Sequence, residues 1–133
     1  MADLQQVDPF ELPDWLGTEP VTWSATSGLR AGARVSGLLG SDGVPDVGCD
    51  LLAVDLAYPV PVVPDDTRVR AHQQWQHGQV LLLADDSAPL VLAVPGAGFT
   101  ADSALDALAR LALAVGADVS RYAMHLQLGR ERG

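Results

Sequence analysis

Short segments in which apolar and polar residues alternate, or in which apolar residues run together, recur along the chain between residues 21 and 94. Alternation is typical of strands with one buried face, whereas a continuous apolar run is typical of a fully buried strand. Glycine, proline and aspartate cluster between these segments, as turns require. We predict strands over VTWSATS (21–27), ARVSGLL (33–39), CDLLAVDLAYPV (49–60), QVLLLA (79–84) and PLVLAV (89–94), the last two forming a hairpin around the turn DDSAP.

A helical periodicity replaces the alternation over about residues 100–115, where apolar side chains recur on one face. Thr100 or Asp102 can cap its N-terminus, and Gly116 can end the helix. Asp106 and Arg110 form a favourable i, i+4 pair on its polar side. The sequence therefore predicts one long helix near the C-terminus.

After this helix, the segment VSRYAMHLQL (119–128) alternates again, with Tyr122 and Met124 on one face and Ala123 and His125 on the other. Strands in series, one long helix and a last strand indicate an α+β fold. We expect a mainly antiparallel sheet of about five to six strands, with the helix packed on one face and followed by a final strand.

The first 20 residues have a different character, because prolines punctuate them while several large apolar side chains remain. We predict an N-terminal arm over residues 1–20 and a single α+β domain over residues 21–133. The arm is expected to pack on the domain or on a neighbouring copy of it. Its large apolar residues are Phe10, Leu12, Trp15 and Leu16.

Leu113 lies on the otherwise polar side of the predicted helix, so the C-terminal half of that helix is apolar nearly all round. Such a helix is buried on more than one side. Either the arm or a second subunit would bury the second side of this helix, and we prefer the interpretation of a homodimer. Leu113, Phe10 and Trp15 would then make the contacts.

Composition narrows the class of protein. With 133 residues, 48% hydrophobic and 19% charged, the chain is long and apolar enough for one globular core. The net charge is −9 and there is no lysine, so the clustered cations that neutralise nucleic-acid phosphates or anionic membranes are missing. The charge favours basic protein partners. A lone cysteine and the lack of a long apolar segment predict a soluble, cytoplasmic protein.

The segment RVRAHQQWQHG (68–78) holds two histidines and a tryptophan, which raises the question of a local metal site. His72 and His77 are five positions apart, so they diverge by about 140° on a helix and point to opposite faces of a strand. Residues 66–77 can form either a helix or a strand. In neither structure can the two histidines bind the same ion. The favoured interpretation is a polar segment that Trp75 anchors.

A composite metal site remains an alternative, in which one of those histidines joins His125 and a third ligand. The third ligand would be Asp50, Asp55 or Cys49. Asp55 also stands out because it lies inside an apolar segment, where a buried carboxylate needs a partner such as Arg34 or Arg68. Cys49 is a poor nucleophile, since the adjacent Asp50 raises its pKa.

The glycine-rich segment GAGFTA (96–101) follows a predicted strand and opens the long helix, which is the context of a nucleotide-binding loop. Only 32 residues follow it, too few for the remaining units of such a fold, so no cofactor is expected. A simple anion site on the backbone amides stays open. A tight strand-to-helix connection is the preferred interpretation.

The loop SDGVPDVGCD (41–50) likewise favours an acidic turn over a calcium site, because its aspartates are spaced by four.

We therefore predict a non-enzymatic protein-binding module, small and acidic like chaperones or inhibitors of basic enzymes, and homodimeric. The alternative is a small enzyme or a protein that binds a small molecule or an anion. Its pocket would lie near Trp75, His125 and the 96–101 loop. The residues that would line it are Asp55, Tyr58, His72, Trp75, His77, His125, Gly96, Gly98 and Thr100.

Overall fold

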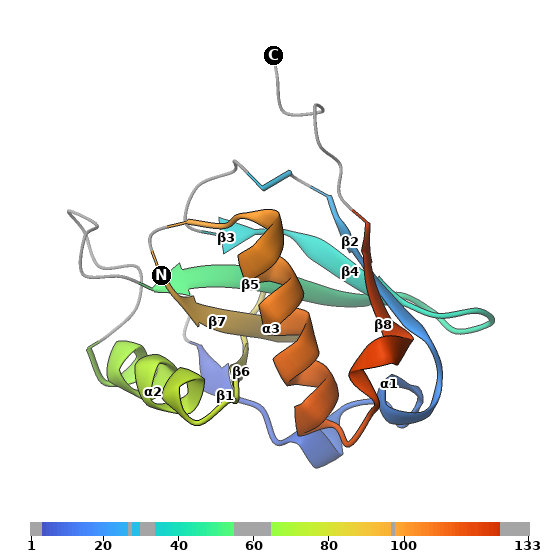
Figure 1. The fold of residues 1–133 in the computed structure, drawn as a ribbon, viewed down its shortest axis with the longest axis horizontal. Helices are drawn as coiled ribbons and strands as arrows, with labels where there is room; N and C mark the ends of the chain where they lie inside the picture. The colour runs from blue at the N-terminus through green and yellow to red at the C-terminus, as the bar shows by residue number, and fades with distance from the viewer. Residues whose placement is uncertain (1–3, 27, 30–33, 55–64, 97, 126–133) are drawn as a thin grey trace.

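The computed structural model of the chain describes residues 4–26, 28–29, 34–54, 65–96 and 98–125. In these ranges a sheet of eight strands combines with three α-helices, so the α+β class is confirmed (Figure 1). The expectation of five to six strands was too low. The strands are β1 (Gln5–Gln6), β2 (Val21–Ala25), β3 (Arg34–Val35), β4 (Gly37–Gly40), β5 (Val47–Val54), β6 (Leu81–Ala84), β7 (Leu90–Pro95) and β8 (Tyr122–His125). The helices are α1 (Trp15–Thr18), α2 (Asp65–Gln76) and α3 (Ala101–Ala114), with 3-10 turns η1 (Pro9–Glu11) and η2 (Val119–Arg121).

The sheet is mixed, with the strand order β1-β6-β7-β5-β4-β2-β8 and with β3 paired to β5. The pairs β5–β7 and β2–β8 are parallel, and the other pairs are antiparallel, as expected for most of the sheet. The predicted hairpin is confirmed as β6 and β7, which pair from Leu81 opposite Ala93 to Leu83 opposite Val91. The additional strand β1 is only two residues long, too short to leave a periodic pattern, whereas β3 lies within the predicted strand 33–39.

The three central strands β5, β6 and β7 are buried on both faces, which explains their continuous apolar sequences. Side chains on one face join the main core with α3, which lies across the sheet in Figure 1. Those on the other face form a second cluster with Ala71 of α2. Residues 66–77, for which helix and strand were both open, are thus mostly helical, and the sheet has a helix on each face.

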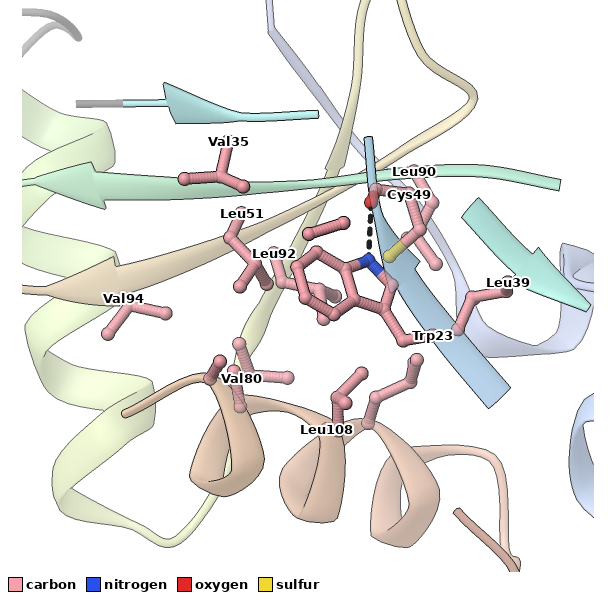
Figure 2. Close-up of a cluster of buried hydrophobic side chains, with 14 of the residues drawn as sticks. Trp23, Val35, Leu39, Cys49, Leu51, Val80, Leu90, Leu92, Val94 and Leu108 are labelled. Carbon is pink, nitrogen blue, oxygen red and sulfur yellow. Dashed lines mark hydrogen bonds between the residues drawn. The ribbon is translucent and has the colours of Figure 1, made fainter. Parts of the chain in front are cut away.

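The side chain of Trp23, in β2, contacts both β4 and β5. Its indole nitrogen donates a hydrogen bond to the backbone carbonyl of Cys49 at 2.8 Å, as Figure 2 shows. The ring passes so close to Gly37 that a Cβ there would overlap it. The predicted strand 33–39 is interrupted at Ser36 and forms β3 and β4, which keep the same register against β5.

The long helix matches its prediction closely. Thr100 caps α3 through a reciprocal pair of hydrogen bonds with Ser103, and Gly116 follows its end with φ +79°. The expected pair is present, with Nε of Arg110 3.1 Å from Oδ1 of Asp106. Local sequence signals therefore define both ends of this element.

The N-terminal residues continue the sheet and pass beneath the C-terminal end of α3 (Figure 1). β1 pairs with β6, and Leu16 of α1 is completely buried in the main core. Gly17 lies so close to the carbonyl of Val115 that a side chain would not fit between them. The hydroxyl of Tyr122 also donates to the carbonyl of Leu16. These residues thus cover part of the end of α3.

Among the described residues, no helix combines the length and apolar character needed to cross a membrane.

Candidate functional site

A cluster of charged side chains around Arg34 joins three parts of the sheet. Arg34 donates from Nε to Asp50 at 2.8 Å, from Nη1 to Asp85 at 2.6 Å, and from Nη2 to Ser87 at 2.9 Å. Asp85 also accepts the backbone N–H groups of Ser87 and Ala88, so it organises the turn between β6 and β7. Sequence reasoning missed this cluster, because it considered Arg34 as a partner of Asp55, which lies outside the described residues.

The geometry of this cluster is that of a structural ion pair network. The hydrogen bond from Arg34 holds the pKa of Asp85 well below its usual range, and the same bond raises the pKa of Arg34. An open hollow of about 510 Å³ adjoins Arg34, Asp50 and Ser87. The guanidinium faces two carboxylates, so the cluster carries one excess negative charge and does not attract an anion.

Burial also raises the pKa of two further groups, the Cys49 thiol and the Tyr122 phenol. Burial, together with the charge of Asp50, raises the pKa of the Cys49 thiol far above its usual range. The protonated thiol is a poor nucleophile, in agreement with the sequence analysis. Within the described residues, every buried side-chain nitrogen or oxygen has a hydrogen-bond partner.

The two histidines of α2, His72 and His77, are exposed, whereas Trp75 packs against the main core. The guanidinium of Arg110 stacks on the Trp75 ring, 3.6 Å from its centroid. Arg110 also donates to the backbone carbonyls of Trp75 and Gln79, which lie at and just beyond the end of α2. These contacts agree with the predicted anchoring role of Trp75.

The other residues of the predicted ligand pocket are dispersed. His125 is exposed on β8, the last strand of the order, whereas α2 packs on β7 and β6, which are separated from β8 by β5, β4 and β2. Thr100 lies about 15 Å along the axis of α3 from Arg110, which covers Trp75. Asp55 and Tyr58 fall outside the described residues. The structure therefore brings neither His125 nor the start of α3 to the α2 histidines.

The loop before α3 is a tight connection. Gly96 adopts φ +148°, a conformation that favours glycine, and Gly98 has open space around it. The hydroxyl of Ser103 accepts the N–H of Thr100 at 2.9 Å, and the hydroxyl of Thr100 accepts the N–H of Ser103 at 3.2 Å. The chain's own side chains thus occupy amides that an anion would need.

Acidic residues in the 41–50 segment do not converge. Asp42 and Asp46 are exposed in the turn between β4 and β5, whereas Asp50 faces Arg34. No three His, Cys, Asp or Glu side chains are grouped for metal binding in the part of the chain that the structure describes.

An apolar surface is the remaining candidate. Phe10 is 95% exposed and Leu113, on the last turn of α3, is 62% exposed. Trp15, the third predicted interface residue, instead packs partly buried against the core. Phe10 borders an open hollow of about 420 Å³, which we call the arm hollow. Residues between Pro9 and Thr18, together with Val115 and Gly116, line it.

No family model matches the chain, and neither the curated proteins nor the solved structures contain a significant match. The geometry of the described residues thus carries the functional argument by itself, and the arm hollow is the candidate site that it favours.

Proposed function

We propose that the protein is a non-enzymatic protein-binding module whose contact surface is the arm hollow. The observation that carries this proposal is the exposure of Phe10, 95%, at the edge of an open hollow. Aromatic side chains dominate the energetics of protein interfaces when they fill pockets and lose contact with water. Leu113, on the last turn of α3, is a second exposed apolar side chain, although it does not line the hollow.

The state of the reactive side chains supports the non-enzymatic part. Cys49 is buried and protonated, and Arg34 engages the carboxylates of Asp50 and Asp85. A general base or nucleophile must instead reach a substrate with its reactive atom free.

The occupant is either another protein or a second copy of this chain, and the homodimer predicted from the sequence is the competing arrangement. Light scattering over a range of concentrations separates the two. A monomer at micromolar concentration removes the homodimer and leaves the partner protein. The cytoplasmic location remains a prediction.

Selection of random peptides displayed on phage against the full chain tests the proposal. We expect enriched peptides to bind the wild type and to lose at least about tenfold in affinity for Phe10→Ser. The matched control is Val69→Ser, which removes an apolar side chain that is 48% exposed on α2. If all enriched peptides bind both variants equally well, the arm hollow is not the contact surface.

A thermal-shift screen with metals, nucleotides and acidic metabolites tests the alternative of a small-molecule or anion-binding protein. A higher melting temperature that survives in Phe10→Ser would favour that alternative over the proposal.

A further inference from the structure

We infer that the arm hollow takes a basic segment of a partner protein, with a large apolar side chain against Phe10 and arginine or lysine side chains around it. This inference rests on the proposed function, because it names the class of partner for the same surface. It follows from the charges around the hollow, the shape of the hollow and the nature of a twofold interface.

The charged side chains of the segment that forms most of the arm hollow, residues 8–19, are of one sign. Between residues 8 and 19 the chain has four acidic residues and no lysine, arginine or histidine. All four are exposed, and Asp14 lines the hollow itself. The four residues are Asp8, Glu11, Asp14 and Glu19. Phe10 thus projects from a segment whose own side-chain charges are all negative, although the guanidinium of Arg121 lies beside Thr18.

The backbone that carries these carboxylates is held in place. The side chain of Asp8 caps η1 by accepting the N–H of Phe10 at 3.0 Å. Arg121 of η2 donates to the carbonyl of Thr18, one of the residues that line the hollow. Its guanidinium therefore ties the arm to η2. A partner cation would meet a surface that is already ordered, which lowers the entropy lost on binding.

The size of the hollow suits single side chains. A volume of about 420 Å³ lies toward the small end of the range of ligand pockets. Phe10 stands at its edge and leaves apolar walls from Leu12 and Val115. One large apolar residue of a partner segment fits there, with flanking cations reaching Glu11 and Asp14.

A second copy of this chain is a poor occupant, because a twofold interface sets the same surface of both subunits together. Here it would place the four carboxylates of one copy against the same four of the other. Like charges brought together in an interface are repulsive and select against that partner. The net charge of −9 adds to the repulsion at long range.

The test uses two fluorescein-labelled peptides of equal length, one of alternating arginine and leucine and one of alternating glutamate and leucine. Fluorescence anisotropy measures their affinity for the full chain. The first variant, Glu11→Lys with Asp14→Lys, reverses two carboxylates beside the hollow. The matched control, Asp42→Lys with Asp86→Lys, reverses two exposed turn carboxylates elsewhere. Both variants change the net charge from −9 to −5.

We expect the arginine peptide to bind at least about tenfold more tightly than the glutamate peptide. Its affinity should fall about tenfold in Glu11→Lys with Asp14→Lys, fall similarly in Phe10→Ser, and change less than about threefold in the control. Equal losses in the two charge-reversed variants would mean attraction by net charge alone and would overturn the inference. Absence of binding by both peptides would also overturn it.

Other outcomes separate this inference from the proposed function. If selected peptides depend on Phe10 but carry no excess of arginine or lysine, the surface binds proteins and the basic partner class is wrong. If self-association is lost in Phe10→Ser, a second copy is the occupant and the inference is again wrong. If no peptide depends on Phe10, both fail.

Discussion

Arg34 and Asp85 are 51 positions apart in the chain, yet Nη1 of Arg34 lies 2.6 Å from Oδ2 of Asp85. The contact ties β3 to the turn between β6 and β7. Because Asp85 also accepts two backbone N–H groups of that turn, its carboxylate joins the turn to β3.

Replacement of Asp85 by asparagine keeps the shape of the side chain and removes its charge. We expect Asp85→Asn to lower the free energy of unfolding at pH 7 by about 1–3 kcal/mol, since hydrogen bonds to a charged partner are lost. Urea denaturation measures this change. Asp86→Asn, in the same turn but exposed, is the control and should change the free energy by less than about 0.5 kcal/mol. Equal effects of the two substitutions would contradict a specific role for Asp85.

The same pair predicts a pH dependence. The pKa of Asp85 is lower in the folded protein than in the unfolded chain, where it is about 3.9. The ionised carboxylate therefore stabilises the folded state above about pH 4, and this contribution is lost as the pH falls toward the folded pKa. The difference in unfolding free energy between wild type and Asp85→Asn should stay constant from about pH 5 to 7 and shrink below about pH 4. A difference that grows in acid would contradict the lowered pKa of Asp85 in the folded protein.

Trp23 provides a test of the sheet core. Trp23→Phe removes the donor to the Cys49 carbonyl and leaves that buried acceptor unsatisfied. We expect a loss of about 2–4 kcal/mol in the free energy of unfolding, from the missing hydrogen bond and the smaller ring. Gly37→Ala should also destabilise, because its Cβ overlaps the Trp23 ring. If Trp23→Phe and Trp75→Phe lower the free energy of unfolding equally, the hydrogen bond of Trp23 does not contribute to stability as we expect.

Cys49 should resist modification in the native protein. The thiol is completely buried and its pKa is raised, so both access and the thiolate form are lacking. In buffer at pH 8, an aromatic disulfide reagent should react with Cys49 only at the rate at which the protein opens or unfolds. In urea above the unfolding midpoint the thiol should react at a rate that depends only on the reagent concentration. Rapid reaction of the folded protein would place the thiol at an accessible surface.

The elements that the sequence predicts well are those whose signals are local. The cap at Thr100, the Asp106–Arg110 pair and the stop at Gly116 all lie within one helix, and the structure has each of them. The β6–β7 hairpin is equally local, because a short turn alone brings its strands together.

What the sequence does not predict depends on contacts between distant residues. The parallel pairing of β2 with β8 joins residues about 100 positions apart, as in Val21 opposite Tyr122. The close approach of the Trp23 ring to Gly37 likewise depends on a residue outside the 33–39 segment. The partner of Arg34 was missed for the same reason, since an ion pair across 51 positions leaves no periodic trace.

The candidate site was predictable only in part. Phe10 and Leu113 attract attention as large apolar residues in polar surroundings, and both are exposed. Trp15 and Leu16 carry the same signal, yet they pack against the core, because the chain of α1 turns toward Val115. Hydrophobicity alone does not distinguish a residue that anchors the arm from one that remains available to a partner.

Hydrogen exchange of the full chain, with and without the arginine–leucine peptide, tests most directly where a partner binds. Our account predicts slower exchange of backbone amides between residues 10 and 19 and around Val115 and Gly116, and unchanged exchange in β2 and β4. Slower exchange confined to β2 and β4, with the arm and the end of α3 unaffected, would contradict it.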